Sequence, residues 1–283
     1  MNRLGVHSHL FRGPPRAVAA SVRDHGLTCV QLTPSFPHLR FDEPGQVTAD
    51  RCRRAAEPFM ESGLQIAALS GGENVLAPEV DRRHPAIVRL HALIRHSHDF
   101  STCRVVLNLG NWESSDHFDS MPLETPARWP EVRCIIAEAL RVADDHGVQL
   151  LLKPDRCQRS SWHASIRRIL GEVTSPNVRF VMDPADYLAN SLLEDVACDV
   201  QRLCKELGPM APLVHAKDLS FGSSGITTPR AGRGSFDYAD FFHIYRSYQP
   251  EAPVILEHLR PGEIEETLSY IESCLAETKR RGP

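Results

Sequence analysis

Eight short apolar segments recur along this chain of 283 residues, and a longer segment with helical periodicity follows each of them. Most of the apolar segments are rich in Val, Ile and Leu and have the length of strands. This alternation allows few folds, because each strand must pair with another strand and each amphipathic helix must cover a sheet. The predicted strands are residues 3–8, 28–34, 64–70, 103–110, 148–153, 178–183, 211–217 and 252–258.

The pattern predicts an α/β fold, a (β/α)8 TIM barrel that forms a single domain over residues 1–283. A doubly wound open sheet is the alternative, and it would be expected to carry a Gly-rich phosphate turn after its first strand. The segment after residues 3–8 contains no such turn. Helix ends are predicted at the glycines of positions 26, 63, 147 and 208, and Asp237 is predicted to begin a helix.

Each of the eight predicted strands carries a polar side chain at or near its carboxyl end. Active sites of such barrels lie at the carboxyl ends of the strands. One polar strand end commonly just begins a loop, whereas burying eight unpaired polar groups would cost a few kcal/mol for each of them. We therefore expect a polar pocket that faces a ligand or water. Its residues would be His7, Gln31, Ser70, Asn108, Lys153, Asp183, His215 and Glu257.

The charge and composition argue against a nucleic-acid or membrane partner. The formal net charge is −4 and the pI is about 6.4, so the chain has no basic field for a phosphate backbone. No run approaches the length of a membrane span. Residues 1–15 contain no apolar h-region with a cleavage site, so we expect no secretory leader. The eight cysteines form no C-x-x-C pair, which is typical of a reducing compartment. We expect a cytoplasmic protein; a homo-oligomer is compatible with the sequence.

Four blocks, "VRFVMDPADYL", "LVHAKD", "GRGSFDY" and "VILEH", occur in this order in the second half of the chain. In these blocks the chain resembles the xylose isomerase-like TIM barrels, which include sugar isomerases, ketose 3-epimerases, inosose dehydratases and hydroxypyruvate isomerases. The resemblance extends over most of the chain and is strongest from Gln149 to Leu259. The related apurinic endonucleases are set aside, because Ser70, Asn108 and Lys153 do not supply the metal ligands that they need.

The resemblance implies one divalent metal held by Glu, Asp, His and Glu at the ends of strands five to eight. Asp183, His215 and Glu257 match three of these positions, whereas Lys153 stands where the strand-five Glu is expected. In the epimerases of the family, two glutamates also move the proton beside the carbonyl, so Glu257 is the predicted catalytic base. Asp186 is a further departure, since His is common at that position.

A lysine at the strand-five position opposes a bound metal. An ammonium about 4 Å from a dication repels it by about 8 kcal/mol at an effective dielectric constant near 20, or about six decades of affinity. We therefore expect no metal; any Mn, Mg, Zn or Co would use Asp183, His215 and Glu257. Lys153 is the second predicted catalytic residue: it would polarise the substrate carbonyl or stabilise an enolate, or act as a base or Schiff-base former.

The predicted substrate-binding residues are His7, Asn108, Asp183, His215 and Lys217. Asn111 and Trp112 are expected either to contact a sugar or to serve the loop and its packing. Residues 220–234 are a long Gly-rich segment and a candidate lid. In it, Arg230 or Arg233 would either face a bound anion or be solvated.

These features predict a sugar isomerase or epimerase-like enzyme of carbohydrate metabolism, acting without metal by proton transfer on a small polyhydroxylated carbonyl compound or hydroxy-keto substrate. The alternative is a non-catalytic TIM barrel that binds a small ligand or a partner protein. Lys153, Asp183 and Glu257 would then be an internal ion network in a degenerate metal site, and His215 a hydrogen-bonded interior histidine.

Overall fold

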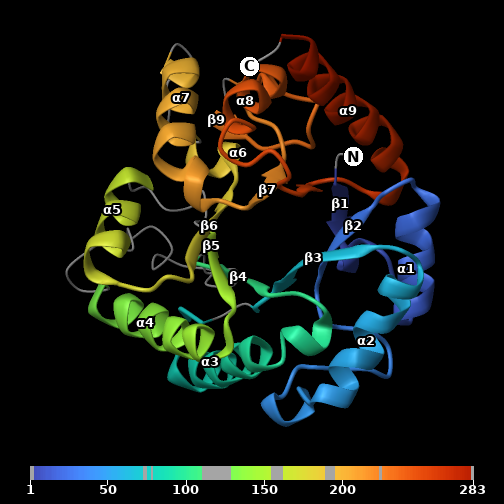
Figure 1. Ribbon diagram of the computed structural model, residues 1–283, viewed down its shortest axis with the longest axis vertical. Helices are drawn as coiled ribbons and strands as arrows, with labels where there is room; N and C mark the ends of the chain where they lie inside the picture. The colour runs from blue at the N-terminus through green and yellow to red at the C-terminus, as the bar shows by residue number, and fades with distance from the viewer. Residues whose placement is uncertain are drawn as a thin grey trace. The chain divides into compact units, whose positions relative to one another are not determined.

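Eight parallel strands close into a barrel in the computed structural model, in the order β1-β10-β7-β6-β5-β4-β3-β2 (Figure 1). The structure describes residues 3–72, 75–77, 79–109, 129–153, 162–188, 195–222 and 225–281. The predicted (β/α)8 barrel is confirmed, and the doubly wound sheet is wrong. The barrel strands are β1 Leu4–His7, β2 Cys29–Leu32, β3 Gln65–Ser70, β4 Arg104–Asn108, β5 Gln149–Lys153, β6 Val178–Met182, β7 Leu213–Ala216 and β10 Val254–Leu256.

Helices connect the strands, as the periodicity predicts. They are α1 Pro15–Asp24, α2 Ala49–Glu61, α3 Val80–Arg95, α4 Trp129–His146, α5 Trp162–Glu172, α6 Pro184–Tyr187, α7 Val196–Leu207, α8 Tyr238–Tyr245 and α9 Ile264–Arg281. Within the described ranges, none of these helices combines the length and the apolar character that a membrane crossing requires.

The chain divides into two compact units. The first comprises Met1–Gln31, Phe59–Ala67 and Phe180–Pro283, and the second comprises Leu32–Pro58 and Ala68–Arg179. The single domain predicted for residues 1–283 stays a prediction.

In the first unit, strands β2, β1, β10, β7 and the end of β6 pair in parallel. Val6 pairs with both Val30 and Leu256, and Leu256 pairs in turn with Ala216. One residue beyond these pairs, the same register brings His7, Glu257 and Lys217 to one level of the sheet. The next pair, Met182 with Val214, likewise brings Asp183 level with His215. The register of this unit therefore assembles the polar strand ends.

In the second unit, β4 pairs with β3 and with β5. Ser70, the last residue of β3, pairs with Val106 of β4. Asn108, the last residue of β4, pairs with Lys153, the last residue of β5. The interior strand residues Leu107 and Leu151 are fully buried, as expected for parallel strands covered on both faces.

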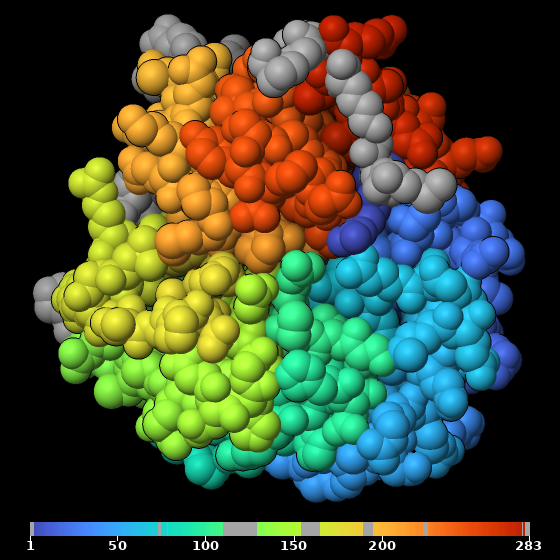
Figure 2. Space-filling model, in the orientation of Figure 1, coloured from blue at the N-terminus to red at the C-terminus, as the bar shows by residue number. Residues whose placement is uncertain are grey.

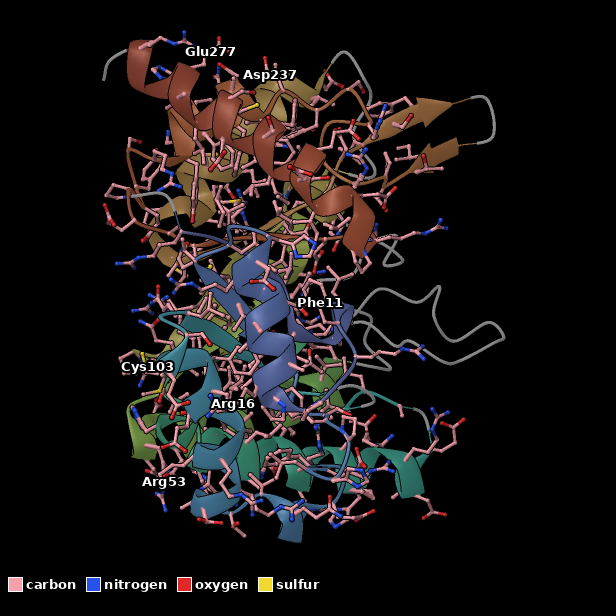
Figure 3. The ribbon with its side chains drawn as sticks, turned by 90° about the vertical axis from the view of Figure 1, so that its right-hand side faces the viewer. Phe11, Arg16, Arg53, Cys103, Asp237 and Glu277 are labelled. Atoms are coloured by element: carbon pink, nitrogen blue, oxygen red, sulfur yellow. The ribbon has the colours of Figure 1, made fainter. Side chains whose placement is uncertain are left out.

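Helices α8 and α9 lie side by side in Figure 1, and their orange and red atoms adjoin in the space-filling view of Figure 2. The Thr278 hydroxyl donates a hydrogen bond of 3.3 Å to the carbonyl of Ala239, so the start of α8 lies beside the end of α9. Figure 3 shows Asp237 near Glu277 in the same region. Phe241 and Tyr245 stack with ring centroids 5.3 Å apart and bury the inner face of α8.

Most predicted helix ends are confirmed, with one difference in backbone conformation. Gly26, Gly63 and Gly147 follow their helices with φ of 74°, 73° and 64°, the left-handed conformation that ends a helix at low cost. Gly208 also follows its helix, but with φ of −48°. Packing explains why this position is a glycine, because a Cβ would stand 2.8 Å from the ring of Tyr248.

The segment at residues 220–234 is more ordered than predicted. Strands β8 Ser220–Gly222 and β9 Gly225–Thr227 form an antiparallel hairpin in which Phe221 pairs with Ile226. Figure 3 shows this hairpin projecting past the N-terminal end of α9. The hairpin is not predictable from the sequence pattern, because strands of three residues carry too little periodicity to stand out among glycines.

Asp237 begins α8 as predicted, and its carboxylate accepts a hydrogen bond of 2.9 Å from the backbone N–H of Asp240. Asp237→Ala should lower the free energy of unfolding by about 1 kcal/mol, because it removes this cap. In a chain of this size, that corresponds to a fall in Tm of about 2 °C, measurable by calorimetry. Asp237→Asn keeps an acceptor and should retain most of the stability; a loss equal to that of the Ala variant would contradict the capping role.

Candidate functional site

A buried ammonium surrounded by carboxylates is the centre of the site in the first unit. Lys217 Nζ lies 2.6 Å from Asp183 Oδ2, 2.8 Å from Asp186 Oδ2 and 3.2 Å from Glu257 Oε2. We call these four residues the lysine–carboxylate cluster. The Lys217 side chain is 2% exposed, so its charge is compensated by these carboxylates. Removing one partner of a buried ion pair typically costs about 3–5 kcal/mol.

The chain brings this cluster together from the ends of β6, β7 and β10 and from the first turn of α6. Asp183 follows β6 and caps α6, accepting a hydrogen bond of 3.2 Å through Oδ1 from the backbone N–H of Asp186. That turn leaves Oδ2 of Asp183 for Lys217 and places Asp186 one helical turn later. Glu257 follows β10, where its backbone N–H donates to the carbonyl of Ala216 at 3.0 Å.

Two histidines approach the other oxygen of Glu257. His7 Nε2 donates to Glu257 Oε1 at 2.9 Å, and His215 Nδ1 lies 2.9 Å from the same oxygen. His215 Nε2 is also 2.7 Å from Gln31 Oε1 on β2, the strand that pairs with β1. The rings of His7 and His215 meet edge to face, with centroids 5.3 Å apart. Glu257 therefore has one oxygen facing an ammonium and one facing two imidazoles.

Solvent reaches only part of this arrangement. Asp183 and His215 are fully buried side chains, whereas 11% of Glu257 and 15% of His7 are exposed. His9, on the 3-10 turn Ser8–Leu10, is exposed, and its ring lies 5.0 Å from that of His7. A ligand that enters this site thus meets Glu257 and His7 before the other residues.

Lys217 is held in place by its own backbone. The hydroxyl of Tyr238 donates a hydrogen bond of 2.7 Å to the Lys217 carbonyl. Burial, followed by the nearby charges of Asp183 and Asp218, raises the pKa of Tyr238 well above its usual value. This phenol therefore stays protonated and keeps donating. Tyr238 is a supporting residue that was not predicted from the sequence.

Asp218 organises the segment that follows β7. Its Oδ1 accepts hydrogen bonds from the backbone N–H groups of Leu219 and Phe236, both at 2.9 Å, and its Oδ2 accepts from Gly232 at 2.8 Å. Gly234 is required beside it, because a Cβ there would stand 2.4 Å from Asp218 Oδ1. The "H-A-K-D" block thus supplies a charge to the cluster through its lysine and a loop anchor through its aspartate.

Arg230 does not fit the predicted role over a bound anion. It is 6% exposed, and its guanidinium donates to Thr267 at 3.0 Å and to Glu266 of α9. Arg233 pairs with Glu266 at 2.6 Å and is 57% exposed, in line with the solvated alternative. At the base of the hairpin, His258 has φ of 55° and donates through Nδ1 to the carbonyl of Thr228 at 2.6 Å.

Lys153 and Asn108 lie in the second unit, where they end β5 and β4 and pair with each other in register. Lys153 is 7% exposed, and its carbonyl accepts a hydrogen bond of 2.8 Å from the N–H of Leu109. Their part in the site of the first unit stays a prediction. Asn111 and Trp112 lie outside the described residues.

The ligand set Asp183, His215 and Glu257 does not fit a divalent metal in this arrangement. A dication on Asp183 Oδ2 and Glu257 Oε2 would stand within about 5 Å of Lys217 Nζ and be repelled by about 7 kcal/mol at an effective dielectric constant near 20. In the described part of the chain, His7, His215 and Glu257 form a second set, with donor atoms within 4.8 Å of one another. Glu257 of that set is also the ion-pair partner of Lys217. We therefore assign no reaction step to a metal.

The comparisons with known proteins agree with this architecture. The sequence model of the family described as xylose isomerase-like TIM barrel matches residues 19–274, and the chain belongs to this family. No curated protein matches the chain in sequence.

Solved structures of the same fold cover almost the whole chain. A D-tagatose 3-epimerase-like protein is 14% identical, with 99% of this chain and 100% of that one covered and a TM-score of 0.75. A xylose isomerase-like TIM barrel protein from Mycobacterium smegmatis, in complex with magnesium, is 14% identical over 98% of both chains, with a TM-score of 0.73. The apo 3-keto-D-glucoside 4-epimerase of E. coli is 14% identical over 97% of this chain and 100% of its own, with a TM-score of 0.69.

The loop anchor predicts a graded loss of stability. Asp218→Ala should lower the free energy of unfolding by about 3 kcal/mol, because three backbone N–H groups lose their acceptor. Asp218→Asn should lose less, since one amide oxygen can still accept while the NH₂ faces Gly232. Urea denaturation measures both, and Asp195→Ala, at an exposed position, is the control. Equal stability of the Asp218→Ala and Asp195→Ala variants would disprove the anchor.

Proposed function

We propose that the protein is an isomerase or epimerase that transfers a proton on a small polyhydroxylated carbonyl compound. The observation that carries the proposal is the environment of Glu257. Its carboxylate accepts hydrogen bonds from Lys217 and His7, lies 2.9 Å from His215 Nδ1 and is still 11% exposed. A general base needs a fixed direction and access to the substrate carbon. The family and its epimerase relatives support the reaction class.

In this proposal Glu257 removes the proton from the carbon next to the carbonyl. The substrate carbonyl becomes an enolate. In an isomerisation, the protonated Glu257 returns the proton to the neighbouring carbon on the same face, while the hydroxyl proton moves from one oxygen to the other. In an epimerisation, water donates a proton to the same carbon from the opposite face, and Glu257 releases its proton to solvent. A fixed positive charge near the enolate oxygen lowers the barrier, and Lys153 is the residue that we assign to this role. His7 and Asn108 are proposed to bind substrate hydroxyl groups.

A non-catalytic barrel that binds a ligand is the second candidate. The mutual pairing of charges within the lysine–carboxylate cluster favours it. Three carboxylates around one buried ammonium form an internal ion network, which a protein can keep for structural reasons alone. Turnover on a panel of ketoses, inososes and hydroxy-keto acids separates the two candidates.

Glu257→Gln should abolish proton transfer while keeping the size and shape of the side chain. With a substrate from the panel, we expect solvent deuterium to enter the carbon beside the carbonyl in the parent, and at a rate about 10²- to 10⁴-fold lower in the variant. Glu251→Gln, at an exposed glutamate just before β10, is the matched control. Undiminished exchange in the Glu257→Gln variant would exclude Glu257 as the base.

Lys153→Met should lower kcat by about 10²- to 10³-fold with a smaller change in KM, because the charge is proposed to act mainly on the enolate. Steady-state kinetics on the same substrate measure this split. Lys205→Met removes an exposed lysine from α7 and should change neither constant. A Lys153→Met variant with parental kcat would remove Lys153 from the mechanism.

A further inference from the structure

The geometry points to Lys217 as the resident cation of the site, whose ammonium takes the electrostatic place of a divalent metal. The inference deepens the proposed function, and its catalytic meaning rests on that function. Its physical content is independent of turnover: Lys217 lowers the affinity of this site for a divalent cation and keeps Glu257 in its working position.

The first argument is the coordination of the ammonium. Three carboxylate oxygens, each from a different residue, lie 2.6, 2.8 and 3.2 Å from Nζ. An ammonium has three N–H donors, so these three acceptors satisfy it completely. Two of the three acceptors, Asp183 and Glu257, stand at positions where the family resemblance implies metal ligands.

The second argument is the way in which Lys217 is fixed. Its carbonyl accepts the hydrogen bond from Tyr238, and Asp218, the next residue, is anchored by three backbone donors. Hydrogen bonds at Lys217 and at the next residue therefore fix the backbone from which the Lys217 side chain extends. A flexible surface lysine that folded back onto polar neighbours would have neither a fixed backbone nor a side-chain exposure as low as 2%.

The third argument concerns Glu257. Lys217 contacts Oε2, while the two imidazoles contact Oε1. Without the ammonium, the carboxylates of Asp183, Asp186 and Glu257 would repel one another at short range. Lys217 is thus a positioning residue for the proposed base: it holds the carboxylate without consuming the oxygen that faces His7.

The test is metal binding without substrate. With neutral imidazoles, three carboxylates and one ammonium give the cluster a formal charge of −2. Lys217→Met changes this to −3, whereas the double variant Lys217→Met/Asp186→Asn restores −2 and keeps Asp183, His215 and Glu257. A gain of metal affinity in the double variant would therefore come from the removal of the ammonium and not from a more negative charge. The double variant also has one unpaired carboxylate fewer, so it serves as the test if the single variant does not fold.

The chain of 283 residues is first treated with a chelator. Mn²⁺ alone is then titrated into it, and binding is measured by calorimetry. We expect the parent to bind with a Kd weaker than about 1 mM, and both variants to bind about 10²- to 10⁴-fold more tightly. The Tm of the variants should rise with Mn²⁺ through mass action. Lys205→Met is the control for loss of a lysine elsewhere and should behave as the parent.

Stoichiometric Mn²⁺ on the parent, with an affinity that the double variant does not improve, would overturn the inference and place the ion on His7, His215 and Glu257. A parent that has no turnover on any substrate but shows the expected gain of metal affinity in both variants would refute the proposed function and support the cation role. The two failures are therefore distinguishable.

Discussion

The ammonium of Lys217 is the interaction on which this site depends. Three carboxylates brought within about 3 Å of one point repel one another strongly in a buried environment, and a cation must stand between them. Asp183, Asp186 and Glu257 come from the end of β6, the first turn of α6 and the end of β10. The same ammonium therefore offsets the negative charge of the site and binds three chain segments of the first unit to one another.

The register of the parallel strands determines which residues share that point. Because side chains alternate along a strand, His215 and Lys217, two residues apart, project to the same side. The pairs Val6–Leu256 and Leu256–Ala216 then bring His7 and Lys217 to opposite sides of Glu257. A slip of one residue in either pairing would separate the base from its partners. The chemistry of the site is in this sense a consequence of backbone pairing.

The sequence alone predicts the barrel, its eight strands and most of the polar strand ends, because the apolar segments are regular and the glycines end the helices. It also identifies His7, Asp183, His215 and Glu257, since each stands at or next to the carboxyl end of a strand. The role of Lys217 was not predicted beyond substrate binding. Its position two residues after His215 was a usable signal, but a pairing between charged side chains depends on distances that no local pattern contains. The pairing of Arg230 with α9 was not predicted for the same reason. The hairpin of β8 and β9 was not predicted because strands of three residues carry too little periodicity.

The two departures from the family pattern become intelligible together when charges are counted. The ligand set that the resemblance implies contains three carboxylates, and a dication would bring its formal charge from −3 to −1. Here Lys153 replaces one of those carboxylates, while Asp186, at a position where histidine is common, supplies another, so the chain again has three with Asp183 and Glu257. Asp186, at a position where the family commonly has an imidazole, gives Lys217 its third acceptor. Our inference about Lys217 explains this departure within the first unit, because a third carboxylate favours a covalently attached cation at that point. At residue 153 a lysine likewise stands where the resemblance implies a carboxylate, and its part in the site stays a prediction.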